Sequence, residues 1–111
     1  MEIAVKECLL GFIMISGQVC AASSRIYVEE SIAPQFTKAI QAAAEGSYGM
    51  FGDPHNKSSI IGTIVDKHQH GRVQQYIEQG KSEGTLLTGG DALGEKVSSP
   101  PFPIFCFGSE F

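Results

Sequence analysis

One apolar stripe between residues 31 and 46 constrains the fold more than any other feature of the sequence. At ~100° per residue its apolar side chains fall within about 100° of arc on one face; they are Ile32, Phe36, Ala39, Ile40 and Ala43. Ser31 can cap the start of the segment, Pro34 is tolerated in a first turn, and Gly46 can end it. The stripe therefore predicts an amphipathic helix that buries one face.

The N-terminal stretch predicts a second, buried helix. Residues 1–15 are mostly apolar with good helix formers, interrupted only at Gly11. Ser16 and Gly17 should end this helix. Cys20 then follows in a turn of small residues.

A third helix is indicated after residue 65. Asp66 can cap it, and its expected end lies near Gln79, with Gly80 just beyond. The side chains that we expect on its buried side are Val73, Tyr76 and Ile77.

Two short stretches favour strands. Residues 25–28, Arg-Ile-Tyr-Val, are β-branched or aromatic, and residues 85–88 form a second stretch that Gly89 and Gly90 close. Residues 46–57 are rich in glycine and polar side chains, which predicts a loop. The order strand, helix, helix, strand favours an α/β layer of short strands with crossover helices.

Composition limits the chain to one small domain. It has 111 residues, 42% of them hydrophobic and 18% charged, which is typical of a globular protein. The net charge of −4 argues against nucleic acid as a partner, because such binding needs clustered Lys and Arg. We expect residues 1–96 to form the domain. Residues 97–111 form an irregular tail of doubtful membership, since Pro100, Pro101 and Pro103 oppose regular strand pairing.

The cysteines and the N-terminus favour a reducing, cytoplasmic location. The 3 cysteines, Cys8, Cys20 and Cys106, fit neither a disulfide framework nor a paired metal knuckle. The apolar run of residues 9–15 leaves a small secreted binding protein as an alternative, although the residues before it carry net negative charge. It is shorter than the ~20 residues that span a bilayer, so no membrane partner is expected.

Metal ligation is not expected of the histidines. His68 and His70 are two apart on an expected helix and point ~200° from each other, while His55 stands alone in a loop. Cys20 has two interpretations: a lone cysteine is commonly a small core residue, whereas a cysteine in an exposed turn of small residues can be a nucleophile.

The residues around Cys20 resemble a known family. The string Ser-Gly-Gln-Val-Cys-Ala-Ala-Ser-Ser-Arg-Ile-Tyr-Val, residues 16–28, is similar to the active-site cysteine segment of the aldehyde dehydrogenase superfamily. The similarity continues to residue 90, through the Gly52-Asp53-Pro54 loop and the helix that holds Arg72. It implies a partial aldehyde dehydrogenase catalytic domain with an incomplete sheet.

The resemblance implies a function for Cys20. Its thiolate would attack the aldehyde carbon, the thiohemiacetal would pass hydride to the nicotinamide of NAD or NADP, and water would release the acid from a thioester. A backbone N–H at the cysteine could stabilise the oxyanion. The substrate would be a small aldehyde.

Cofactor contacts are also implied by the resemblance. The positions that match Gln69 and Arg72 lie beside the cofactor ribose in this family, with Lys usual where this chain has Arg72. The alternative is two solvated side chains on an exposed helix face. The family is usually homo-oligomeric.

The sequence also departs from the family pattern. Ile15 stands where Asn is usual, five residues before the cysteine, and Thr63 stands where Pro is common. The family's glutamate general base and its dinucleotide-binding half match nothing in this chain, and no GxGxxG follows an expected strand. We therefore expect the isolated chain to be inactive. A nonenzymatic, truncated or decayed gene product is the competing hypothesis.

Overall fold

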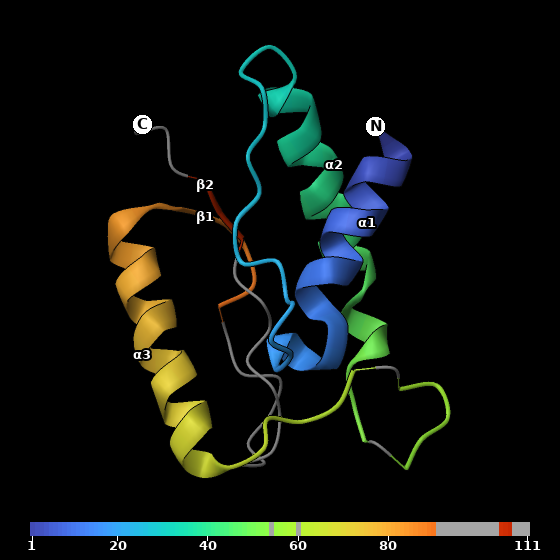
Figure 1. Ribbon diagram of the computed structural model, residues 1–111, viewed down its shortest axis with the longest axis vertical. Helices are drawn as coiled ribbons and strands as arrows, with labels where there is room; N and C mark the ends of the chain where they lie inside the picture. The colour runs from blue at the N-terminus through green and yellow to red at the C-terminus, as the bar shows by residue number, and fades with distance from the viewer. Residues whose placement is uncertain (54, 60, 91–104, 108–111) are drawn as a thin grey trace.

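Two helices packed against each other form the core of the computed structural model, which describes residues 1–53, 55–59, 61–90 and 105–107. They are α1 (Glu2–Ile13) and α2 (Ala33–Gly46), and Figure 1 shows them side by side. Buried side chains recur every fourth residue on both helices, and these are Val5, Leu9 and Ile13 on α1 and Phe36, Ile40 and Ala44 on α2. Side chains four residues apart form a ridge on the surface of a helix, and such ridges pack into the grooves of a neighbouring helix. Ile61 joins the same cluster.

The expected stripe on α2 is largely confirmed. Phe36 and Ile40 are buried, and Ala39 and Ala43 pack against the core. The helix contains a proline in its first turn and ends at Gly46, as expected. The N-cap residue of α2 differs from the one expected.

Ser31 does not cap α2, contrary to expectation. Its hydroxyl donates to a carboxylate oxygen of Glu29 at 2.6 Å, and Ile32 occupies the N-cap position without a side-chain hydrogen bond. Ile32, at this N-cap position, is 43% exposed, so it does not extend the buried stripe.

The first helix ends earlier than the sequence predicts. α1 continues through Gly11 but stops at Ile13, and a 3₁₀ turn, η1 (Met14–Gly17), follows. Ile15, Ser16 and Gly17 have φ values of 52°, 56° and 73°, in the left-handed region. Three consecutive left-handed residues reverse the chain before Cys20. No helix in the described part of the chain is long and apolar enough to cross a membrane.

The expected strand at residues 85–88 is confirmed as β1 (Thr85–Thr88). It pairs antiparallel with β2 (Phe105–Phe107), with a register shift between Leu86 and Thr88. The expectation that prolines prevent pairing in the tail is therefore wrong for residues 105–107. Proline removes only its own donor, and the paired stretch begins after the last of the three prolines. Residues 97–104 and 108–111 lie outside the described residues.

The expected strand at Arg25–Val28 is not formed. The segment is extended, but the sheet in the described residues contains only β1 and β2. β-branched and aromatic side chains favour an extended backbone, yet a strand also needs a neighbour to pair with, and no described segment takes that place. Among the described residues, no two parallel strands joined by a crossover helix occur either.

The third helix, α3 (Lys67–Glu83), begins as expected. Asp66 is its N-cap, and the carboxylate accepts a hydrogen bond from the Gln69 N–H at 2.8 Å. The helix runs past Gly80, contrary to expectation. Its last turns are held by side-chain contacts of Gln79 with Glu83 at 2.7 Å and of Lys81 with Glu78 at 3.0 Å.

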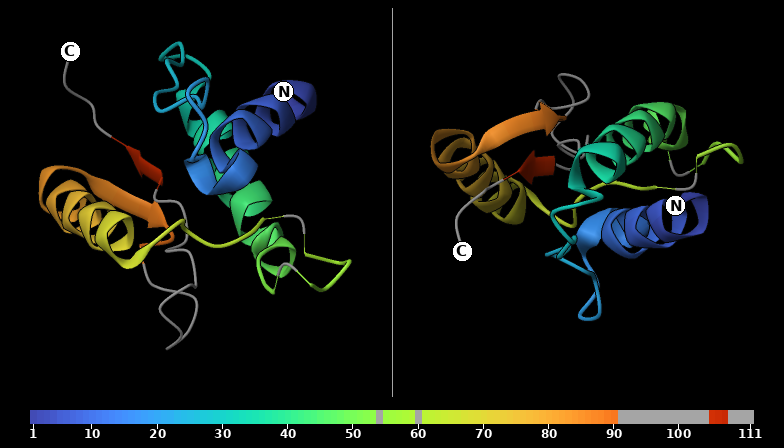
Figure 2. Two further views of the ribbon diagram at one scale, coloured as in Figure 1. Left: turned by 60° about the horizontal axis from the view of Figure 1, so that its bottom comes forward. Right: turned by 90° about the horizontal axis from the view of Figure 1, so that it is seen from above.

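The buried side of α3 is narrower than expected. Ile77 is buried and Val73 half-buried, but Tyr76 is 69% exposed. α3 contacts β1, which in turn contacts α2. Figure 2 shows the strands between α3 on one side and the α1/α2 pair on the other. α3 therefore packs against the rest of the protein along one side, and much of its surface is exposed to solvent.

The expected loop at residues 46–57 contains some regular structure. A 3₁₀ turn, η2 (Tyr48–Met50), follows α2, and Phe51 forms a parallel bridge with Ile61. The Tyr48 hydroxyl lies 3.1 Å from the Thr88 hydroxyl, which links this turn to β1. Pro54 lies outside the described residues.

Candidate active site around Cys20

Cys20 lies in the turn that follows η1, and its side chain is exposed. The turn is closed by the Ala22 N–H, which donates to the Val19 carbonyl at 3.0 Å. Cys8, in contrast, is half-buried on α1 and packs against the core. The two thiols therefore differ in exposure to solvent. Cys20, which the sequence indicated as the candidate nucleophile, is the more exposed of the two.

The Cys20 N–H is open as well. Within the described residues it donates to no acceptor. A backbone N–H in an exposed turn can donate to an oxygen that comes close to the adjacent thiol. Thiol and donor belong to one residue, so their relative positions are limited by covalent geometry.

Gln18 fastens the turn to a segment far along the chain. Its side-chain Nε2 donates to the Thr63 carbonyl at 3.0 Å, and its Oε1 accepts from the Val65 N–H at 2.8 Å. The same Nε2 lies 3.3 Å from the Ile15 carbonyl. One carboxamide thus links the chain before Cys20 to Thr63 and Val65, in the segment that precedes α3.

Two further contacts hold the turn on either side of Cys20. The Ser16 hydroxyl donates to the Gly62 carbonyl, and the Ser23 N–H donates to the Gly11 carbonyl at 2.9 Å. A Cβ at Gly11 would lie 3.3 Å from the Ser23 Oγ, a tight contact. Gly11 therefore allows the chain after Cys20 to approach α1 closely.

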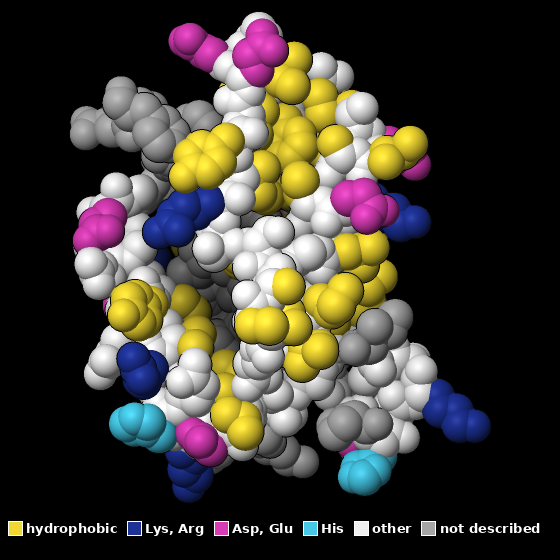
Figure 3. All heavy atoms as spheres, in the orientation of Figure 1, with side chains coloured by type: hydrophobic (Ala, Val, Ile, Leu, Met, Phe, Trp, Pro, Cys, Tyr) yellow, Lys and Arg dark blue, Asp and Glu magenta, His cyan; other side chains and the backbone are white. Residues whose placement is uncertain are grey.

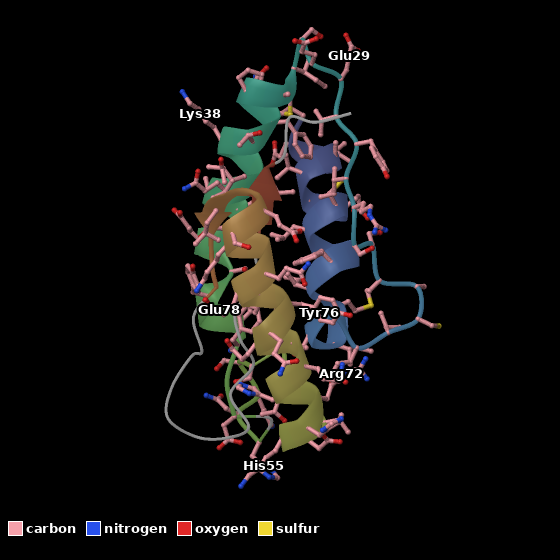
Figure 4. The ribbon with its side chains drawn as sticks, turned by 90° about the vertical axis from the view of Figure 1, so that its left-hand side faces the viewer. Glu29, Lys38, His55, Arg72, Tyr76 and Glu78 are labelled. Carbon is pink, nitrogen blue, oxygen red and sulfur yellow. The ribbon has the colours of Figure 1, made fainter. Side chains whose placement is uncertain are left out.

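The second set of expected site residues lies on α3. Arg72 is exposed and lines a shallow groove together with Gln75, Tyr76 and Gln79. These positions are three or four apart and share one face of the helix. Figure 4 shows Arg72 and Tyr76 projecting from the same side of α3, with Glu78 on the other side.

Gln69 is half-buried one turn before Arg72, on the same side. Within the described residues, no hydrogen bond or ion pair joins Cys20 to either side chain. No group of three His, Cys, Asp or Glu side chains that could hold a metal ion occurs in the part of the chain that the structure describes.

The comparison with family models decides the relationship. Residues 1–102 match the model of the aldehyde dehydrogenase family. The chain belongs to this family. The match extends at both ends beyond residues 16–90, which carry the resemblance described above.

Individual aldehyde dehydrogenases are also similar to the chain in sequence. Aldehyde dehydrogenase family 2 member C4 of Arabidopsis thaliana is 42% identical over 95 residues, which are 84% of this chain and 18% of that protein. A mitochondrial aldehyde dehydrogenase of Leishmania tarentolae is 43% identical over 82 residues, 73% of this chain and 16% of that protein. The chain thus spans between about a sixth and a fifth of the length of these relatives.

A solved aldehyde dehydrogenase has the same fold over this region. The NAD⁺ complex of the enzyme from Bacillus cereus superposes with a TM-score of 0.80 at 30% identity, covering 91% of this chain and 20% of that one. The described elements, mostly helical, are therefore part of the α/β fold of aldehyde dehydrogenases.

The role of Gln18 was not predicted, although the sequence contained a signal for it. Within the aldehyde dehydrogenase motif, Gln18 stands between Gly17 and the cysteine, in a turn where few side chains can be buried. A carboxamide carries donors and an acceptor, so it can satisfy a carbonyl and an N–H at once. The partners at residues 63 and 65 could not be read from the sequence.

Proposed function

We propose that Cys20 is the nucleophile of an aldehyde-oxidising site. The observation that carries the proposal is the exposed thiol next to an open backbone N–H, in a turn fixed on both sides. The thiolate sulfur bonds to the aldehyde carbon while the C=O electron pair moves to oxygen. The Cys20 N–H then donates to that oxygen.

The cofactor proposed is NAD or NADP, which supplies the hydride acceptor when bound. Arg72 and Gln69 are the residues proposed to hold its ribose. The donor set of the α3 groove fits such a group, because guanidinium and carboxamide N–H groups donate to hydroxyl and phosphate oxygens. Tyr76, 69% exposed, adds a flat apolar surface beside them.

We propose that the 111-residue chain by itself has no catalytic activity toward aldehydes. General base catalysis contributes ~10²- to 10⁴-fold, and neither a base nor a dinucleotide-binding half is identified in this sequence. The sheet is also proposed to be incomplete, because Arg25–Val28 is extended yet pairs with no described strand. A small aldehyde as substrate and the cytoplasm as location complete the proposal.

Acyl transfer tests the nucleophile without a cofactor. The chain is incubated with p-nitrophenyl acetate, and the acetylated cysteine is located by peptide mapping. We expect one acetyl group at Cys20, lost in Cys20→Ser and kept in Cys8→Ser. Acetylation of Cys8 at an equal rate, or an unmodified Cys20, would contradict the proposal.

The competing function is a nonenzymatic product of the family. One observation favours it: within the described residues, no hydrogen bond or ion pair joins Cys20 to the side chains of the α3 groove. Because exposure alone favours Cys20 over Cys8 in the folded chain, acetylation of Cys20 in the native chain is compared with acetylation of Cys20 in urea, and a product without a formed site shows no faster reaction in the native chain.

A further inference from the structure

The loop between η2 and α3 carries an asparagine in an acceptor pattern for sugars. Residues 56–58 are Asn-Lys-Ser, which matches the pattern Asn-x-Ser/Thr, with x other than proline, at which asparagine is glycosylated. Asn56 is the only asparagine of the chain. A pattern of three residues also occurs by chance, so it indicates a site only where the structure presents the asparagine side chain to solvent.

The loop projects from the molecule. Residues 55–58 are all exposed, and a bridge between Phe51 and Ile61 holds the two ends of the loop together. Figure 1 shows the loop, in yellow-green, extending beyond the helices, and Figure 4 shows His55, the residue before Asn56, pointing away from the protein. In Figure 3, drawn in the same orientation as Figure 1, this corner of the surface carries polar side chains. An enzyme can therefore reach the loop without displacing packed side chains.

The Asn56 side chain is held by Ser58 through its oxygen alone. The Asn56 Oδ1 accepts the Ser58 N–H at 3.1 Å and the Ser58 hydroxyl at 2.8 Å. In this kind of turn, the side-chain carbonyl of an asparagine binds the residue two positions further on. Within the described residues, Asn56 Nδ2 donates to no acceptor. The nitrogen that receives a sugar is therefore open, while the oxygen of the same carboxamide is fixed.

The hydroxyl contact also favours the chemistry of transfer. A hydrogen bond to Oδ1 polarises the carboxamide and draws electron density from Nδ2 toward the oxygen, which makes the Nδ2 protons easier to remove. Ser58 therefore has two effects on Asn56: it fixes the turn and it polarises the acceptor group.

We propose that Asn56 is a glycosylation site whose donor is a sugar joined through its anomeric carbon to a diphosphate. Asn56 Nδ2 bonds to the anomeric carbon, the bond from that carbon to the phosphate oxygen breaks, and the diphosphate leaves with the electron pair. One Nδ2 proton passes to a basic group of the transferase, and nothing is oxidised or reduced. The reaction does not involve Cys20, so it is independent of the proposed aldehyde oxidation.

Two donors test the proposal on the folded full chain. One is a nucleoside diphosphate hexose with a soluble asparagine glycosyltransferase, and the other is a lipid-linked sugar diphosphate with a detergent-solubilised transferase. Intact mass spectrometry counts the sugars, and peptide mapping locates them. We expect one sugar at Asn56 with at least one donor, and the donor that reacts distinguishes a soluble source from a membrane-bound one. A chain that stays unmodified with both donors, or one modified only at another residue, would overturn the proposal.

Substitutions in the loop test the part that Ser58 plays. Ser58→Ala removes the hydroxyl that contacts Asn56, and we expect the rate of transfer to fall ~10-fold, as for one lost hydrogen bond. Ser58→Thr retains a hydroxyl and should stay within about 3-fold of the original rate. Ser59→Ala is the matched control, because it removes the hydroxyl of the next residue in the same loop. Circular dichroism checks that every variant is folded. Equal rates in Ser58→Ala and Ser59→Ala would contradict the proposed site.

Discussion

The side-chain oxygen of Gln18 lies 2.8 Å from the backbone nitrogen of Val65, 47 positions along the chain. The same carboxamide donates to the Thr63 carbonyl, so the turn before Cys20 and the segment before α3 are joined at two points. Local propensity cannot hold a run of left-handed residues in place. A long-range contact of this kind can, and it makes the position of Cys20 depend on residues 63–65.

Removal of the Gln18 carboxamide should loosen the turn. We expect Gln18→Ala to lower the free energy of unfolding by about 0.5–1.5 kcal/mol, because exposed hydrogen bonds to two backbone groups are lost. Gln79→Ala is the control, since Gln79 makes an exposed side-chain contact to Glu83 within one helix, where such pairs contribute ~0.2–0.5 kcal/mol. Urea unfolding followed by circular dichroism measures both. Equal losses would show that the long-range clamp has no special role.

Relief of backbone strain at Ile15 should stabilise the chain. Its φ of 52° is unfavourable for a β-branched residue, by roughly 1–2 kcal/mol, and asparagine tolerates this region. The side chain is 58% exposed, so its removal costs little buried area. We expect Ile15→Asn to raise the free energy of unfolding by about 1 kcal/mol. Ile15→Val keeps the branch and should change little; a loss of stability in Ile15→Asn would contradict the account.

The N-cap of α3 should have a measurable effect, because this helix packs through one edge. Asp66→Ala removes the acceptor of the Gln69 N–H, and we expect a loss of ~1 kcal/mol. Asp66→Asn retains an acceptor oxygen and should lose less than half of that. Urea unfolding supplies the values, and equal effects of Ala and Asn would mean that the cap is not formed in solution.

Periodicity predicted the elements that depend on one face being apolar. Neighbouring residues alone were enough to predict three features: the stripe on α2, the cap and start of α3, and β1. The end of α1 did not, because the left-handed values at Ile15 and Ser16 are stabilised by Gln18 and Ser16 through contacts with residues 62–65. Ser31 was expected to cap α2, but its hydroxyl donates to Glu29, and Ile32 occupies the N-cap position.

Strand pairing was the least predictable part. Residues 25–28 have the composition of a strand, but pairing depends on a partner that composition does not specify. Residues 105–107 pair although prolines precede them. At the candidate site, the exposed turn at Cys20 followed from its small neighbours, whereas its tethers to Gly11 and residues 62–65 required the structure.

Relative alkylation of Cys20 and Cys8 tests most directly whether the folded turn selects the reactive thiol. A neutral reagent such as iodoacetamide is applied to the native chain and to the chain in urea, and peptide mapping gives the two rates. Because Cys20 is exposed and Cys8 packs against the core, we expect Cys20 to react at least ~10-fold faster in the native chain and at a similar rate in urea. Equal native rates, or faster reaction of Cys8, would contradict the assignment of Cys20 as the site's nucleophile.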